Sequence, residues 1–191
     1  GRPGRGHPLS RVHALTRRHR PIQALRAAPA IVHPSDGEPL VAFHSCVSTG
    51  WDSLDQIIDQ LRRGDNVVWQ VDNIDDCQRR VTAFVNRALA NSERVVYVRF
   101  ARHLPLIEER SDLVTVHRLD VGQGFESFSS QVHTLITREG RDIFYVFDSL
   151  SDLLHVWATD LMIGDFFFIT CPYLFELNTV AYFALLRHRH S

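Results

Sequence analysis

The feature that most constrains the fold is a series of short apolar runs that alternate with segments of helical periodicity. Within each run the apolar residues are nearly continuous, as in strands that are buried on both faces. Such strands belong to parallel sheets whose two faces are covered by the connecting helices. We therefore predict a three-layer α/β fold with a mainly parallel sheet and helices on both faces. The predicted strands are Asn66–Val71, Arg94–Phe100, Val114–Leu119, Asp142–Asp148 and Phe166–Thr170.

Between these runs, apolar residues recur three and four positions apart, which places them on one side of a helix. Glycine often follows the last turn of a helix because it readily adopts a left-handed conformation. Gly64 and Gly140 are expected to end two of the helices in this way. The predicted helices are Trp51–Leu61, a segment around Val81–Leu89, Phe125–Ile136, Ser151–Met162 and Phe175–Arg187.

The first 45 residues differ from the rest in composition. They are rich in Gly, Pro, Arg and His and show no sustained helical or strand period. All 21 basic residues of the chain are arginines, and seven of them precede Ala27. We predict that residues 1–45 form a disordered leader and that residues 46–191 form one α/β domain. Arginines can contact nucleic acid, but the formal net charge of −1 gives no overall attraction to nucleic acid or membranes, so we expect neither as a partner.

The predicted last helix is followed by only four residues, 188–191. In a sheet of this type a helix normally leads into another strand. We therefore interpret the domain as a fragment that is truncated at its C-terminus and lacks its last strands.

The cysteines and the longest apolar stretch bear on the location of the protein. Three widely spaced cysteines form no CxxC pair, which fits a reducing cytoplasm and not a disulfide framework. The longest apolar stretch, Leu161–Phe175, is interrupted by Asp165 and Pro172 and is too short to span a bilayer. We expect a cytoplasmic protein. The cysteines are Cys46, Cys77 and Cys171.

The turn after the first predicted strand is where an open parallel sheet usually binds phosphate, at the N-terminus of the next helix. A working phosphate loop needs glycines, a lysine and a Ser or Thr that holds magnesium. Here the turn, Asp72–Gln78, has neither glycine nor lysine and carries three carboxylates. We expect Asp72, Asn73, Asp75 and Asp76 to cap the helix. A cation site at Asp75 and Asp76 is the alternative, but two carboxylates fall short of the six or more oxygens that calcium takes.

The strand Asp142–Asp148 ends in an aspartate followed by Ser149. An acidic residue at the end of an apolar strand is typical of a Walker B strand, which holds magnesium in nucleotide-binding proteins. Asp148 and Ser149 are therefore candidate cofactor-binding residues. Without a phosphate loop to anchor the metal, Asp148 would instead bond to neighbouring backbone or to Ser149.

Together, these segments resemble a known family. Ser48–Asp55 and Leu61–Asp65 resemble the opening of RecA/KaiC-type ATPases, and Asp148–Ser151 resembles their Walker B region. Other segments are similar to the N-terminal domain of phosphoenolpyruvate synthase and pyruvate phosphate dikinase-related proteins. The resemblance covers about three quarters of the chain and implies a RecA-like P-loop NTPase fold in degenerate form. The latter segments are Gly64–Asp72, Val96–His103, Trp157–Gly164 and Thr170–Leu177.

The resemblance implies a parent protein that uses ATP to convert pyruvate to phosphoenolpyruvate through a phosphohistidine. That chemistry resides in ATP-grasp, swivelling histidine and barrel domains, which this segment lacks. Relative to active RecA/KaiC ATPases, the P-loop is replaced by Asp72–Gln78, and the strand that should end in a water-activating glutamate ends in Arg99–Arg102. Only Asp148 of the catalytic set is retained.

We therefore expect a non-catalytic regulatory or scaffolding domain, with no catalytic residues and no cofactor. Its expected partners are the other domains of the parent protein, or further copies of itself. The alternative is an ATP-binding phosphotransferase or ATPase subunit with a divergent site, in which Asp148 holds magnesium and an arginine replaces the lysine. Arginine and lysine are not interchangeable in a tight phosphate site, which disfavours this alternative.

Two further sites follow from residue clusters. Arg99, Arg102 and His103 lie just after one strand and form a candidate pocket for a carboxylate or phosphate. The alternative is that these cationic groups pair with Asp72, Asp75 or Asp148 of adjacent loops. The eleven histidines include no HExxH motif, and we predict no metal site.

Overall fold

The computed structural model describes residues 12–14, 46–108, 112–156 and 160–186. Most of the predicted leader, the segment 157–159 and the end of the chain at 187–191 lie outside these ranges. Within the leader, β1 (Val12–Ala14) pairs with β4 (Asn66–Val71) in antiparallel fashion, with Val12 opposite Trp69.

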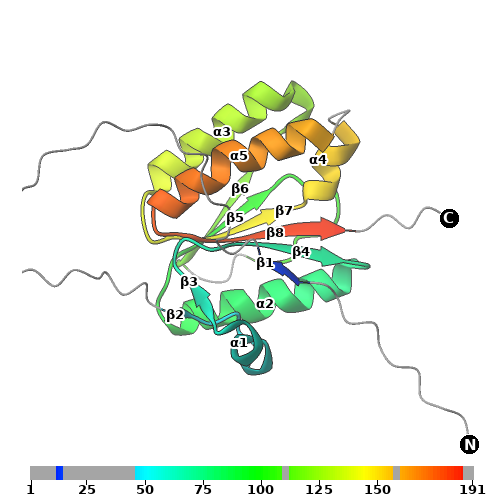
Figure 1. Ribbon diagram of the computed structural model, residues 1–191. Coiled ribbons are helices and arrows are strands. Elements are labelled where there is room, and N and C mark those ends of the chain that lie inside the picture. Colours follow the sequence, from blue (N-terminus) through cyan, green and yellow to red (C-terminus); the bar gives the residue numbers. More distant parts are fainter. Residues whose placement is uncertain (1–11, 15–45, 109–111, 157–159, 187–191) are drawn as a thin grey trace, which may run out of the picture.

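The centre of the molecule is a six-stranded sheet in the order β1-β4-β8-β7-β5-β6. All its strands except β1 run parallel to one another. Helices cover both faces, as Figure 1 shows, with α1 and α2 on one side and α3, α4 and α5 on the other. The predicted α/β fold, a parallel sheet flanked by helices on both faces, is therefore confirmed. The remaining strands are β5 (Val95–Arg99), β6 (Val114–Arg118), β7 (Phe144–Asp148) and β8 (Val180–Leu186).

Two long helices follow the amphipathic segments of the sequence. α2 and α3 each bury one apolar side, which is where the free energy of helix folding mostly comes from. In α2, for example, Val81, Phe84 and Val85 are buried. The helices are α1 (Asp52–Ile58), α2 (Ile74–Ala90), α3 (Phe125–Glu139), α4 (Leu150–Val156) and α5 (Asp160–Glu176), with a short 3-10 helix η1 (Val121–Gln123) before α3.

The two faces of the sheet form separate apolar cores because successive strand residues point to opposite faces. Tyr97 and Val146 lie in the core under α2, whereas Val98 and Phe147 lie in the core under α3, α4 and α5. Aromatic rings fill much of both cores. On the α2 side the ring of Phe84 stacks on that of Tyr182, with their centroids 3.8 Å apart.

Two predicted elements near the end of the chain are wrong. The predicted strand Phe166–Thr170 lies within α5, where Phe166 and Thr170 are buried one helical turn apart and Phe168 between them is exposed. The predicted final helix Phe175–Arg187 is largely β8, whose residues Val180–Ala184 are all buried. The interpretation of a truncated sheet depended on that helix, so its basis no longer applies.

The first predicted helix, Trp51–Leu61, is also shorter in the structure. It ends at Ile58 because Asp59 and Gln60 both adopt positive φ angles, 57° and 60°. Leu61 then pairs with Val47 in a small antiparallel sheet of β2 (Cys46–Val47) and β3 (Leu61–Arg62). Gly64 therefore lies in the turn that leads into β4 and does not end the helix.

The predicted helix Ser151–Met162 corresponds to parts of two helices, α4 and α5, on either side of residues 157–159. Among the described residues, no helix is long and apolar enough to cross a membrane.

Candidate functional site

The turn between β4 and α2 lies at the carboxyl edge of the sheet and is very short. Only Asp72 and Asn73 separate the two elements. Asn73 caps the helix, since its side-chain oxygen accepts a hydrogen bond from the backbone N–H of Asp76 at 2.8 Å. The predicted capping role is confirmed for Asn73. Arg79 donates a hydrogen bond to Asp76 and lowers the pKa of that carboxyl.

Asp148, the last residue of β7, is fully buried at the same edge. One carboxylate oxygen accepts a hydrogen bond from the Tyr97 hydroxyl on β5. The other lies 2.9 Å from Nε2 of His103, within ion-pair distance. The Tyr97 hydroxyl also accepts a hydrogen bond from the backbone N–H of Leu106 at 3.0 Å. Asp148 is thus held by β5 and by the segment that follows it.

The backbone of Asp148 fixes the same segment. Its carbonyl oxygen accepts hydrogen bonds from the N–H groups of Phe100, at 2.8 Å, and Ala101, at 3.0 Å. The carboxylate of Asp148 contacts the side chains of Tyr97 and His103, whereas the predicted partners were neighbouring backbone and Ser149. Ser149, the other Walker B-like residue, is fully buried as well. It does not line any of the cavities described below.

The buried carboxylate of Asp148 changes the titration of its neighbours. Its hydrogen bond to His103 raises the pKa of that imidazole, with a smaller contribution from the contact of His103 Nδ1 with the carbonyl oxygen of Leu104 at 2.7 Å. Burial, and then the charge of Asp148, raise the pKa of Tyr97. The same two causes raise the pKa of Cys77 to about 12. The His103 imidazole thus places Nε2 beside the Asp148 carboxylate and Nδ1 beside the carbonyl oxygen of Leu104.

A cavity of about 290 Å³ opens beside this ion pair. It contains Arg102 and His103 of the predicted anion pocket but not Arg99, whose guanidinium donates to the backbone carbonyl of His103. Asp152 also lines the cavity and opposes the binding of an anion. The full lining is Phe100, Arg102, His103, Val121, Ser151, Asp152, His155, Val156 and Leu186.

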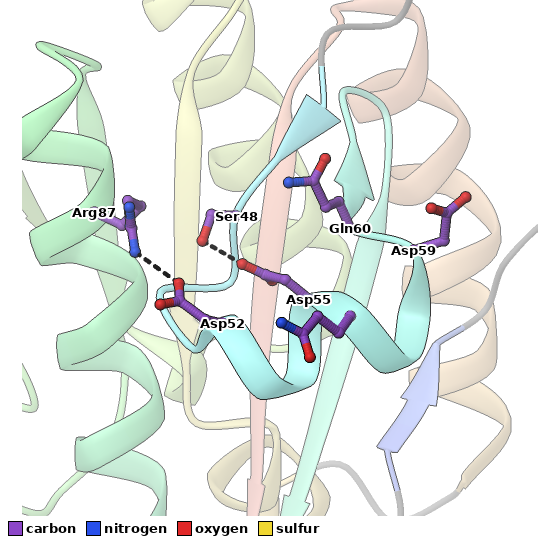
Figure 2. A pocket seen from close by; sticks show the side chains of 7 residues that line it. Ser48, Asp52, Asp55, Asp59, Gln60 and Arg87 are labelled. Carbon is purple, nitrogen blue, oxygen red and sulfur yellow. Dashed lines mark hydrogen bonds and ion pairs between the residues drawn. The ribbon is translucent and has the colours of Figure 1, made fainter.

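A second cavity, of about 380 Å³, lies between α1 and α2 and is shown in Figure 2. Its central carboxylate, Asp55, accepts hydrogen bonds from the Thr49 backbone N–H at 2.8 Å, from the Thr49 hydroxyl at 2.7 Å and from the Ser48 hydroxyl. At its rim, Arg87 pairs with Asp52 at 3.1 Å. These contacts fasten the Ser48–Trp51 turn onto α1, so they serve the fold. The remaining lining residues are Gln56, Asp59 and Gln60.

A third, smaller cavity of about 230 Å³ lies between α2 and the segment Pro105–Glu108. It contains no candidate site residue. Across the described ranges, no group of three or more His, Cys, Asp or Glu side chains could hold a metal ion.

Two contributors to the site were missed from the sequence. Tyr97 and His155 carry polar atoms at the carboxyl edge, the first toward Asp148 and the second in the 290 Å³ cavity. Tyr97 lies inside an apolar run, where a tyrosine is indistinguishable from a core residue. Asp55 has a weak sequence signal, since Ser48 and Thr49, seven and six residues upstream, are suitable donors for a buried carboxylate.

Comparison with known proteins adds no identification. No protein-family model matches the chain, and no curated protein matches it significantly.

Proposed function

We propose that this domain is a non-catalytic RecA/KaiC-like module that regulates or scaffolds a cytoplasmic protein related to phosphoenolpyruvate synthase and pyruvate phosphate dikinase. In this proposal the phosphotransfer chemistry and the partner surfaces belong to other domains of the parent protein. The resemblance of segments such as Gly64–Asp72 and Val96–His103 supports the family. The parallel sheet, with an aspartate at the carboxyl end of an inner strand, is compatible with a degenerate RecA-like fold.

The observation that carries the proposal is the environment of Asp148. A strand-end aspartate that serves a nucleotide must be able to reach magnesium. Here both carboxylate oxygens already face protein partners, Tyr97 and His103, and the group has no exposed surface. A cation at this position would have to displace the imidazole of His103 and give up its own hydration to reach a fully buried carboxylate.

The turn after β4 provides a second argument. A phosphate loop surrounds the phosphates with backbone N–H groups over about eight residues. The Asp72–Asn73 connection is only two residues long, and the Asn73 side chain already satisfies one of the free N–H groups of α2. Asp75 and Asp76 occupy the first turn, so their negative charge repels a triphosphate from the helix N-terminus.

Equilibrium titration of the full chain with a fluorescent ATP analogue and Mg²⁺ tests this proposal. We expect no saturable binding into the millimolar range. The competing outcome is the divergent ATP-binding site, with ATP and Mg²⁺ as cofactors. It predicts micromolar affinity that is lost in Asp148→Ala.

A matched control variant shows whether a loss of nucleotide binding is specific to Asp148 or follows from removing any carboxylate. Glu126→Gln removes an exposed carboxylate from the first turn of α3 and should leave any nucleotide binding unchanged. Micromolar binding that survives Glu126→Gln and disappears in Asp148→Ala contradicts the proposal, provided that both variants retain the circular dichroism of the wild type.

A further inference from the structure

The outward face of α5 is unusually apolar for a surface helix. Phe168 exposes 81% of its surface and Leu161 exposes 72%. Surface helices normally direct charged and polar residues to solvent, whereas over residues 161–176, where the exposure of α5 is described, only Asp165 and Glu176 are charged. We call this surface the α5 stripe. Its large apolar side chains are Leu161, Met162, Phe168, Ile169 and Phe175.

The stripe has the spacing of a helix-packing seam. Leu161, Phe168 and Phe175 are seven residues apart, and Met162 and Ile169 repeat the same interval one position later. Seven residues are close to two helical turns, so these side chains remain on one face along the whole helix. This is the repeat by which one helix packs its side chains into the spaces of another.

The stripe also contains a space that fits one of its own side chains. In helix packing, a side chain enters a hole formed by four residues at positions i, i+3, i+4 and i+7 of the facing helix. Leu161, Gly164, Asp165 and Phe168 have this spacing. Because Gly164 has no side chain and nothing lies within 4 Å of the position of its missing Cβ, the hole is open on the side of Gly164.

We propose that the α5 stripe is a self-association surface, on which the α5 helix of a second copy of this chain packs in antiparallel orientation. About a twofold axis between Asp165 and Phe168, the Phe168 ring of each copy enters the hole around Gly164 of the other. The Phe168 ring and the hole around Gly164 lie within about one helical turn of each other on the same helix. The surface is therefore complementary to a second copy of itself, as a twofold interface requires. The inference is independent of whether the domain binds nucleotide.

The exposed apolar area of the α5 stripe is consistent with packing against a second copy of the chain. If a fully exposed large apolar residue presents about 200 Å², the exposed fractions of the stripe correspond to roughly 550 Å² on each copy. This is near the upper end of the largest apolar patches on monomers, about 300–600 Å². It also supplies most of the roughly 800 Å² that each partner contributes to a standard interface. We therefore expect dissociation constants in the micromolar range.

Analytical ultracentrifugation of the full chain, over concentrations up to about 500 µM, tests the proposal. Wild-type protein should show a monomer–dimer equilibrium. Phe168→Glu places a charge in the seam, and Gly164→Leu fills the hole while raising the helix propensity. Each should weaken the dimer by at least about tenfold, equivalent to about 1.4 kcal/mol.

The matched control is Ile57→Glu on α1, because Ile57 has the same 81% exposure and lies outside the stripe. It should leave the dimer unchanged. Gly164→Leu is especially informative, since it fills open space in the monomer and should not lower the melting temperature of the monomer.

Several results overturn the proposal. A chain that remains monomeric throughout the range refutes it, as does a dimer that Phe168→Glu leaves intact. Binding of the monomer to anionic lipid vesicles that is lost in Phe168→Glu, without self-association, assigns the stripe to a membrane surface instead.

Discussion

Replacing His103 by glutamine should destabilise the domain more at pH 6 than at pH 9. The substitution leaves the fully buried carboxylate of Asp148 with the Tyr97 hydroxyl but without its cationic partner. Removing one member of a buried ion pair costs about 3–5 kcal/mol. Because the His103 side chain retains 21% exposure and glutamine can still donate a hydrogen bond, we expect a loss of about 2–3 kcal/mol in the free energy of unfolding.

The pH dependence follows from the direction of the pKa shift. The pKa of His103 is raised in the folded state, so the extra stability is fully present below the unfolded value of about 6.5. It is lost as the pH rises through the folded pKa. Urea unfolding at several pH values should therefore show the difference between wild type and His103→Gln shrinking toward pH 9. At pH 6 the melting temperature should fall by roughly 5–10 °C.

A second histidine provides the control. His117 has a similar side-chain exposure, 20%, and lies 3.3 Å from Glu139, which also pairs with Arg94 and Arg138 at their solvent-exposed side chains. Its replacement by glutamine should cost less than about 1 kcal/mol because partly exposed pairs are screened by solvent. If His103→Gln and His117→Gln destabilise equally, or if the His103→Gln difference is constant from pH 6 to pH 9, the charged pair with Asp148 is refuted.

Three further substitutions test the local structure by thermal unfolding. Gly50→Ala should cost at least about 2 kcal/mol, because Gly50 has a φ of 86° and an added Cβ would overlap the carbonyl of Ala83. Asn73→Ala removes the cap of α2 and should cost about 1 kcal/mol. Tyr97→Phe removes the hydroxyl that donates to Asp148 and should cost about 2 kcal/mol.

Each of these substitutions has a comparison that isolates its cause. Gly124 also has a positive φ, 90°, but nothing lies near its Cβ position, so Gly124→Ala should be milder than Gly50→Ala. Asn73→Ser should retain most of the stability because serine is also a good cap. If Tyr97→Phe is as stable as the wild type, the hydrogen bond from the Tyr97 hydroxyl does not stabilise the buried Asp148 carboxylate.

Strands whose apolar runs are bounded by charged residues could be predicted from the sequence alone. Val95–Arg99 and Phe144–Asp148 are continuous apolar runs bounded by charged residues, and both are strands as predicted. The run Phe166–Thr170 has a similar composition but belongs to α5. Periodicity cannot distinguish a buried strand from a segment of helix over five residues. In the structure the segment is helical, with Phe166 and Thr170 buried one turn apart and Phe168 exposed between them.

The candidate site was predictable only in part, for a related reason. Asp148 could be recognised locally, since an acidic residue follows an apolar strand. Its partner Tyr97 lies 51 positions earlier and is brought to it by the pairing of β5 with β7. The two-residue connection at Asp72–Asn73 also depended on knowing where β4 ends and α2 begins. Such long-range contacts are set by the sheet topology and leave no short-range signal.

The position of β8 has a consequence for how the chain folds during synthesis. This strand is the last of the described strands to leave the ribosome, yet it lies between β4 and β7. Until Val180–Leu186 emerges, β4 and β7 have unpaired edges that face each other across a gap, and such edges invite pairing with other chains. Efficient folding in the cell should therefore depend on chaperones that shield the half-built sheet.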